Sequence, residues 1–186
     1  MKIRFFNHKK GLTLVEVLLV IFIISILVAI PFWGGTQYIA RNRLRSEAVK
    51  IKSFTENERT NAMAMTTRRA IEFNGWDVTI YVEDLSRPLP NLDSIVATYP
   101  NYFSSKINFG GLPGATALRG GSIDSDGVMF GSSQNNNRLV FTAFGLVENP
   151  GELYINDGRN LMCIAVNGFG QVRIYRWTGG SWNEVK

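Results

Sequence analysis

The sequence predicts an α+β fold, in which a long N-terminal α-helix packs on an antiparallel β-sheet that forms a head domain. Three observations predict it. Residues 12–30 form an almost unbroken apolar run, and residues 37–65 place apolar side chains mostly three or four positions apart. From residue 69 onward, short alternating segments are separated by runs rich in Gly, Asn and Pro, which is typical of strands and turns.

The apolar run, Leu12–Ile30, contains only three polar residues, Thr13, Glu16 and Ser25. A helix of this length spans about 28 Å, close to the hydrocarbon thickness of a bilayer. Basic residues precede the run and none lies within it, so we expect the N-terminus in the cytoplasm and the rest of the chain outside. A secretory signal peptide would be shorter and would place its small residue after the apolar stretch. Here Gly11 comes before it.

Glu16 favours a segment that packs against other copies of itself. A carboxylate among lipid-facing side chains costs about 2.5–3.5 kcal/mol, so Glu16 requires a partner. Cleavage of the chain after Gly11 would create an α-amino group on Leu12. That cation, on a neighbouring copy of the helix, would lie at a depth that matches Glu16.

Residues 9–20, KKGLTLVEVLLV, closely resemble the cleavage and methylation motif of type IV prepilins and of type II secretion pseudopilins. The resemblance implies that a prepilin peptidase cuts between Gly11 and Leu12 and methylates Leu12, where the family usually has Phe. It also implies that Glu16 guides assembly of the filament. The implied parts of the pilin fold are a prepilin leader peptide at 1–11, a transmembrane and assembly helix at 12–35, and an extracytoplasmic amphipathic helix with its β-sheet head at 36–186.

The function that the resemblance implies is structural, and no enzyme is expected. The chain would be a minor pilin or pseudopilin that crosses the bacterial inner membrane once, with its head outside, and then joins a type IV pilus-like filament. Its partners would be the prepilin peptidase and other pilins or pseudopilins. The strand pattern from Val128 to Ile174 further resembles the GspH/FimT type of minor pilin. A signal-anchored surface protein that does not polymerise is an alternative.

A filament-tip subunit that binds DNA for natural transformation is a second alternative. On the last long strand, Val172 and Ile174 are expected to point inward. Arg173, Tyr175 and Trp177 then share the other face and could bind a single strand by charge and stacking. FimT-like minor pilins are associated with DNA uptake through a Gly-Arg-x-Arg motif, of which residues 170–173, GQVR, keep one Arg. The alternative explanation of this pattern is a face that packs on a neighbouring subunit.

Composition excludes several other classes of function. The net charge is +5, but four of the 20 basic residues precede Gly11, which leaves 16 against 15 acidic residues, so global charge gives no case for DNA binding. The single histidine, His8, lies in the leader, and no metal or other cofactor is expected. Cys163 cannot form an intramolecular disulfide and lies in an apolar run, where burial is expected. Residues 124–127, DSDG, lack the later Glu of a calcium loop and predict a turn.

The expected secondary structure is a hairpin followed by shorter strands. Residues 69–73 and 76–82 flank an Asn74-Gly75 turn. Further strands are expected at 106–109, 127–130, 138–142, 152–156, 161–167 and 171–177, and residues 83–121 are expected to form a variable surface region. The charged face of the helix, which includes Glu58, is expected to face solvent or a neighbouring subunit.

Overall fold

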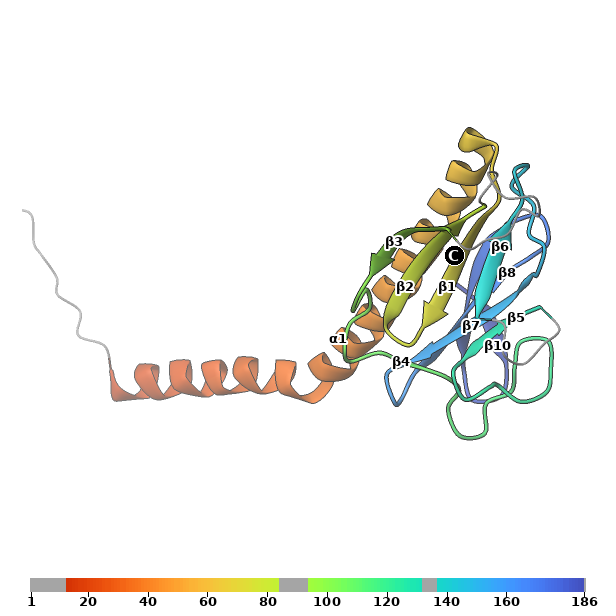
Figure 1. Cartoon of the computed structure of the whole chain (residues 1–186). Helices are drawn as coiled ribbons and strands as arrows, with labels where there is room; N and C mark the ends of the chain where they lie inside the picture. Colours follow the sequence, from red (N-terminus) through yellow and green to blue (C-terminus); the bar gives the residue numbers. More distant parts are fainter. Residues whose placement is uncertain (1–12, 84–93, 132–136, 186) are drawn as a thin grey trace, which may run out of the picture. The chain divides into compact units, whose positions relative to one another are not determined.

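The computed structural model describes residues 13–83, 94–131 and 137–185, with the backbone alone for residues 27–37. The chain divides into two compact units, Met1–Ile39 and Ala40–Lys186. One helix, α1, spans Leu14–Met65 and contributes to both units (Figure 1). The expected leader, residues 1–11, and Leu12 lie outside the described residues.

Thr13 fixes where α1 begins. Its hydroxyl oxygen accepts a hydrogen bond from the backbone N–H of Glu16 at 3.3 Å, and its carbonyl oxygen accepts from the N–H of Val17 at 3.2 Å. A threonine followed three positions later by a glutamate is the pattern of a helix capping box. The first turn also places an acidic residue near the positive end of the helix dipole, which stabilises the helix start.

Beyond Ala40, α1 buries one face along its length. The buried side chains are spaced three or four residues apart, as the periodicity of the sequence predicts, and they are Leu44, Ala48, Ile51, Thr55, Glu58 and Ala62. Glu58 corrects the expectation of a solvated charge, because it is 3% exposed. Met65, expected on the apolar face, is exposed at the end of the helix.

In the described part of the head, the strands form two antiparallel sheets and not one. The four-stranded sheet has the order β3-β2-β1-β6 and the six-stranded sheet the order β10-β9-β8-β7-β4, with β5 also paired to β7. The strands are β1 (Arg69–Asn74), β2 (Asp77–Val82), β3 (Ser94–Tyr99), β4 (Asn108–Phe109), β5 (Val128–Phe130), β6 (Arg138–Phe141), β7 (Gly151–Asn156), β8 (Leu161–Val166), β9 (Val172–Trp177) and β10 (Trp182–Glu184). The α+β class with antiparallel sheets is therefore confirmed.

The hairpin β1–β2 is confirmed with a shifted turn. Asn74 pairs with Asp77, so the two central residues are Gly75 and Trp76, and not Asn74 and Gly75. Gly75 has a φ of +59°, which a glycine adopts without steric cost at the first central position of a type II′ turn. The sequence did not predict β3 or β10, and β3 lies inside residues 83–121, which were expected to form a variable surface region.

The main hydrophobic core lies where α1 meets both sheets. It joins Leu44 and Ile51 of the helix to the inner faces of the strands. The rings of Phe73 on β1 and Phe130 on β5 lie 5.9 Å apart and connect the two sheets directly. In the part of the chain after Ala40, Figure 1 shows α1 running alongside these strands.

A second cluster covers the opposite face of the six-stranded sheet. Tyr154, Leu161 and Cys163 are buried there beneath Ala117, and Leu112 and Leu118 pack at its edge. All six residues of β7 are therefore buried, because both faces of that strand are covered. Part of the segment expected to be variable surface thus covers a core.

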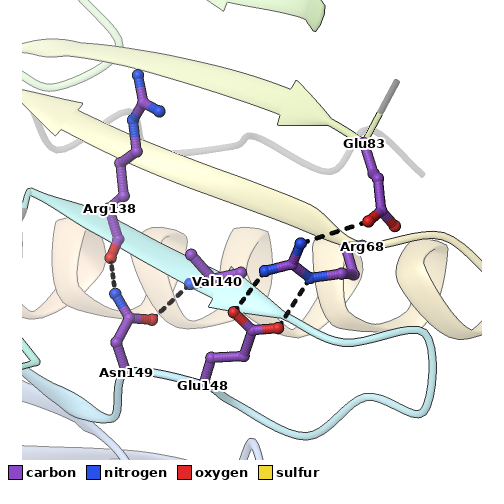
Figure 2. A network of polar contacts seen from close by, with 6 residues as sticks. All are labelled: Arg68, Glu83, Arg138, Val140, Glu148 and Asn149. Atoms are coloured by element: carbon purple, nitrogen blue, oxygen red, sulfur yellow. Dashed lines mark hydrogen bonds and ion pairs between the residues drawn. The ribbon is translucent and has the colours of Figure 1, made fainter. Parts of the chain in front are cut away.

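Side chains close the outer edge of β6 (Figure 2). Asn149 accepts a hydrogen bond from the N–H of Val140 at 2.8 Å and donates one to the carbonyl oxygen of Arg138. Close by, Arg68 donates two hydrogen bonds to Glu148, at 2.8 and 2.7 Å, and a third to Glu83 at 3.3 Å. An edge strand whose backbone groups are occupied in this way is protected from pairing with another chain.

The described residues include no helix that is both long and apolar enough to cross a membrane. The expected transmembrane segment, 12–35, includes Leu12 and the side chains of residues 27–35, which lie outside the described set. That expectation stays a prediction.

A buried ion pair ties the end of α1 to β1. Arg69 donates a hydrogen bond from Nε to Oε2 of Glu58 at 2.9 Å, and Asn61 donates to Oε1 of the same carboxylate at 3.0 Å. The side chains of Arg69 and Glu58 are 6% and 5% exposed. Removing one partner would leave the other as an uncompensated charge in the core.

We expect Arg69→Met to lower the free energy of unfolding by about 3–5 kcal/mol, because Glu58 loses its cation. Urea unfolding of the full chain in a neutral detergent, followed by circular dichroism, measures the change. Lys52→Met is the matched control, since Lys52 and Glu56 form an exposed pair at 3.8 Å and should contribute about 0.5 kcal/mol or less. Equal losses in the two variants would contradict the importance of the buried pair.

Candidate functional site

The N-terminal unit presents apolar side chains around the whole circumference of its helix. Each described residue from Thr13 to Ile26 is exposed, including Leu14 at 77% and Phe22 at 65%. A helix that is apolar on all sides is normally buried in a membrane or among other helices. Exposed apolar surface of this extent marks a contact with lipid or protein.

Glu16 is the only charged residue between Thr13 and Ile26. Among the described residues, no cation contacts its carboxylate. Ser25 differs, because its hydroxyl donates to the carbonyl oxygen of Ile21 at 2.7 Å and is satisfied within the helix. Glu16 is thus a charge in an apolar segment that needs a partner from outside the described chain. Gly11 and Leu12, the other two predicted residues of this site, lie outside the described residues.

The three candidate DNA-contact residues share one face of β9, as alternation along the strand predicts. Val172 and Ile174 are buried on the other face. Tyr175 and Trp177 are half-buried, because they pack against the second core cluster. The ring of Trp177 lies 5.2 Å from the ring of Trp182 on β10.

Arg173 is the most open of the three, with a side chain that is 54% exposed. It forms a long ion pair with Glu184 of the neighbouring strand β10, at 3.8 Å. The rings of Tyr175 and Trp177 are partly engaged in packing, so they offer less surface for base stacking than an open platform would. The DNA-contact hypothesis stays a prediction.

Gly170, the first residue of the GQVR segment, has a packing role of its own. Its φ is +73°, and a Cβ there would lie 2.5 Å from Nε of Arg59 and 2.7 Å from the carbonyl oxygen of Gly145. Arg59, on α1, donates from Nε to that carbonyl oxygen at 2.8 Å. Two turns thus close around the arginine, and Val147 in one of them donates to the carbonyl oxygen of Gly168 in the other at 2.9 Å. A glycine at 170 therefore has a structural explanation without nucleic acid.

Cys163 is a buried thiol beside a buried carboxylate that the sequence did not single out. Burial, reinforced by the charge of Glu152, raises the pKa of Cys163 well above its usual value. The hydroxyl of Tyr154 donates to Glu152 and accepts from the N–H of Leu118 at 2.7 Å. Arg119 forms an ion pair with Glu152 at 3.1 Å, without the geometry of a hydrogen bond. A protonated thiol in this network serves packing, as expected.

Residues 124–127 form a turn, as their composition predicts. The N–H of Gly127 donates to the carbonyl oxygen of Asp124 at 3.0 Å, and Asp126 accepts from the N–H of Val128 at 3.1 Å. A Cβ at Gly127 would lie 2.2 Å from the backbone nitrogen of Gly110, so the close approach of the two segments requires glycine. Within the described ranges, no group of three His, Cys, Asp or Glu residues could hold a metal ion.

The N-terminal part of the chain matches a known family model. Residues 6–30 match the family model described as the prokaryotic N-terminal methylation motif. No curated protein and no solved structure matches the chain. The motif is of the type IV pilin-like kind, and it implies processing by a prepilin peptidase, a signal anchor in the bacterial envelope and assembly with other pilins.

We expect Gly170→Ala to destabilise the head by about 2–4 kcal/mol, since left-handed strain adds to a clash with the fixed carbonyl oxygen of Gly145. Gly179→Ala is the matched control. Gly179 has a similar φ of +81° but nothing within 4 Å of the added Cβ, so only the strain of about 1–2 kcal/mol should appear. Thermal unfolding of both full-length variants compares the two costs. Equal costs would show that Arg59 and Gly145 rearrange freely.

Proposed function

We propose that the chain is a minor pilin or pseudopilin subunit, cleaved after Gly11 and N-methylated on Leu12 by a prepilin peptidase, that assembles into a type IV pilus-like filament. The methylation motif over residues 6–30 supports processing of this kind and indicates a structural protein. Before assembly, the subunit is held in the bacterial inner membrane by a single span, with its N-terminus in the cytoplasm and its head outside.

The observation that carries the proposal is the exposed apolar surface between Leu14 and Ile26, with Glu16 as its single charge. Lipid can cover this surface before assembly, but lipid supplies no fixed cation for the carboxylate. Neighbouring helices in a filament supply both a cover and the α-amino group of Leu12. The segment is therefore suited to exchange one environment for the other.

The head supports a structural role in a different way. Its stability comes from two packed clusters and from internal ion pairs, since Cys163 is the only cysteine in the sequence. Such a head remains folded while the N-terminal segment changes its surroundings, because the clusters contain only residues after Ala40. The choice among a pilus, a secretion pseudopilus and a competence filament depends on the partners of the subunit.

We expect the mature chain to begin with a methylated Leu12. Mass spectrometry of the N-terminal peptide, in a host that contains a prepilin peptidase, measures this directly. Gly11→Glu should leave the full-length chain in the membrane, because a bulky charged side chain then lies next to the bond that the peptidase cleaves. Asn7→Glu is the control, with the same residue introduced four positions before Gly11. An intact Met1 in the wild-type protein would instead favour a signal-anchored surface protein that does not polymerise.

We expect Glu16→Val to insert into the membrane at least as well as the wild type and to assemble poorly. Insertion becomes easier by about 2.5–3.5 kcal/mol when the charge is removed, whereas assembly loses the partner of the α-amino group. Immunoblots of the membrane and sheared-filament fractions measure the ratio. Ser25→Val is the control in the same segment, and it should assemble normally because the hydroxyl of Ser25 is bonded within the helix. Normal assembly of Glu16→Val would refute the role of the carboxylate.

A further inference from the structure

Three arginines from distant parts of the sequence meet at one pocket of the head. Arg41 lies on α1, Arg159 in the connection between β7 and β8, and Arg176 on β9. Trp177, Leu112 and Pro113 contribute apolar surface to the same pocket. Spacing along the sequence gives no sign of this convergence, because the three arginines belong to separate elements.

The arginines are not neutralised by acidic side chains among the described residues. Arg41 donates from Nε to the amide oxygen of Asn160 at 3.3 Å, a neutral partner. Asp157 lies next to the pocket-lining residues Arg159 and Asn160. Its carboxylate accepts hydrogen bonds from the backbone N–H groups of Asn160 at 2.6 Å and of Arg159 at 3.0 Å. Burial opposes ionisation of Asp157, but these donors hold its pKa below the usual value. The single negative charge of Asp157 does not neutralise the three arginines, so the pocket keeps a net positive charge.

A second pocket with arginines shows the contrast. It is lined by Arg119 and Arg173, and each of these forms an ion pair, with Glu152 at 3.1 Å and with Glu184 at 3.8 Å. The head thus neutralises the arginines of one pocket internally and leaves those of the other without a carboxylate. An anion from outside the chain is the natural partner of Arg41, Arg159 and Arg176.

The position of Arg41 in the sequence limits where this anion can come from. Arg41 follows residue 35, the expected end of the membrane segment, by six residues. Even a fully extended chain of that length spans only about 20 Å, whatever the arrangement of the two units. The polar headgroup layers add about 10–15 Å in total to a hydrocarbon core of about 30 Å. The pocket is therefore tethered within reach of the membrane surface before assembly.

We propose that this pocket binds the phosphate group of an anionic phospholipid headgroup. Guanidinium groups match phosphate oxygens in geometry and charge. Trp177 adds an amphipathic ring of the kind that is enriched at the membrane interface. A single compact pocket suits one headgroup, whereas binding of a polynucleotide needs a groove that follows several phosphates. The position of the pocket near a membrane rests on the proposed function. The match between its guanidinium groups and a phosphate does not.

Native mass spectrometry of the full chain, released from a neutral detergent, tests the proposal with phosphatidylglycerol and phosphatidylcholine as probes. Phosphatidylglycerol should bind more tightly than the zwitterionic lipid. The double variant Arg159→Gln, Arg176→Gln should weaken phosphatidylglycerol binding by about fivefold for each arginine removed. Arg173→Gln, with the same change of charge in the second pocket, should bind like the wild type. Circular dichroism of both variants verifies that the head is folded.

Equal binding of phosphatidylglycerol by the wild type and the double variant would overturn the proposal. Inorganic phosphate as a separate probe distinguishes the source of the ligand: binding as tight as that of phosphatidylglycerol would overturn the headgroup assignment. Loss of binding to a single-stranded oligonucleotide in the double variant, with lipid binding unchanged, would assign the pocket to nucleic acid and overturn it too. A methylated Leu12 without any lipid preference would refute this inference alone, and an unprocessed Met1 would refute the proposed function alone.

Discussion

The packing of one face of α1 against two sheets is the constraint on which the head depends. Because both sheets reach the helix, a single stripe of small and branched side chains, from Leu44 to Ala62, stabilises both of them. The stripe also contains a charge, Glu58, and this is tolerated because Arg69 from the adjoining strand reaches it at 2.8 Å. The six-stranded sheet is then left with an uncovered outer face, and the segment from Leu112 to Leu118 covers it. One helix face thus determines which later parts of the chain become core and which become surface.

The sequence predicts the elements that have a local signal. The helix follows from a period of three to four residues, and the hairpin β1–β2 follows from alternation around a glycine. β3 was missed because its apolar residues, Ile95, Val96 and Ala97, are consecutive, so the sequence shows no alternation. In the structure, Ile95 and Val96 are both exposed. Glu58 was placed on the wrong face because its partner lies on another element, and a periodic pattern contains no information about such a partner. The division into two sheets is equally a property of the tertiary structure, since the same strands in the same order could form one.

The same distinction separates the parts of the candidate sites. Glu16 could be recognised because a charge inside an apolar run is anomalous within a single segment. The alternation of β9 correctly placed Arg173, Tyr175 and Trp177 on one face, but it could not indicate that two of the three pack against the second cluster. The arginine pocket had no sequence signal, because Arg41, Arg159 and Arg176 come together only through the fold. A chemical feature confined to one segment can be predicted from the sequence, whereas the convergence of distant residues cannot.

Charged groups without an internal partner among the described residues occur both in the N-terminal segment and in the head. Inside the head, Glu58 and Glu152 each have an arginine, because an unpaired charge in a core is costly. Glu16 and the arginine pocket have no such internal compensation among the described residues. A carboxylate in an apolar segment and a group of guanidinium groups beside a tryptophan call for partners of opposite charge, an ammonium for the first and a phosphate for the second. Both partners would be present where a subunit of this kind waits before assembly: phosphate at the membrane surface, and the amino termini of other subunits within the bilayer. On this view, the charges that the chain leaves uncompensated are the ones through which it recognises its surroundings.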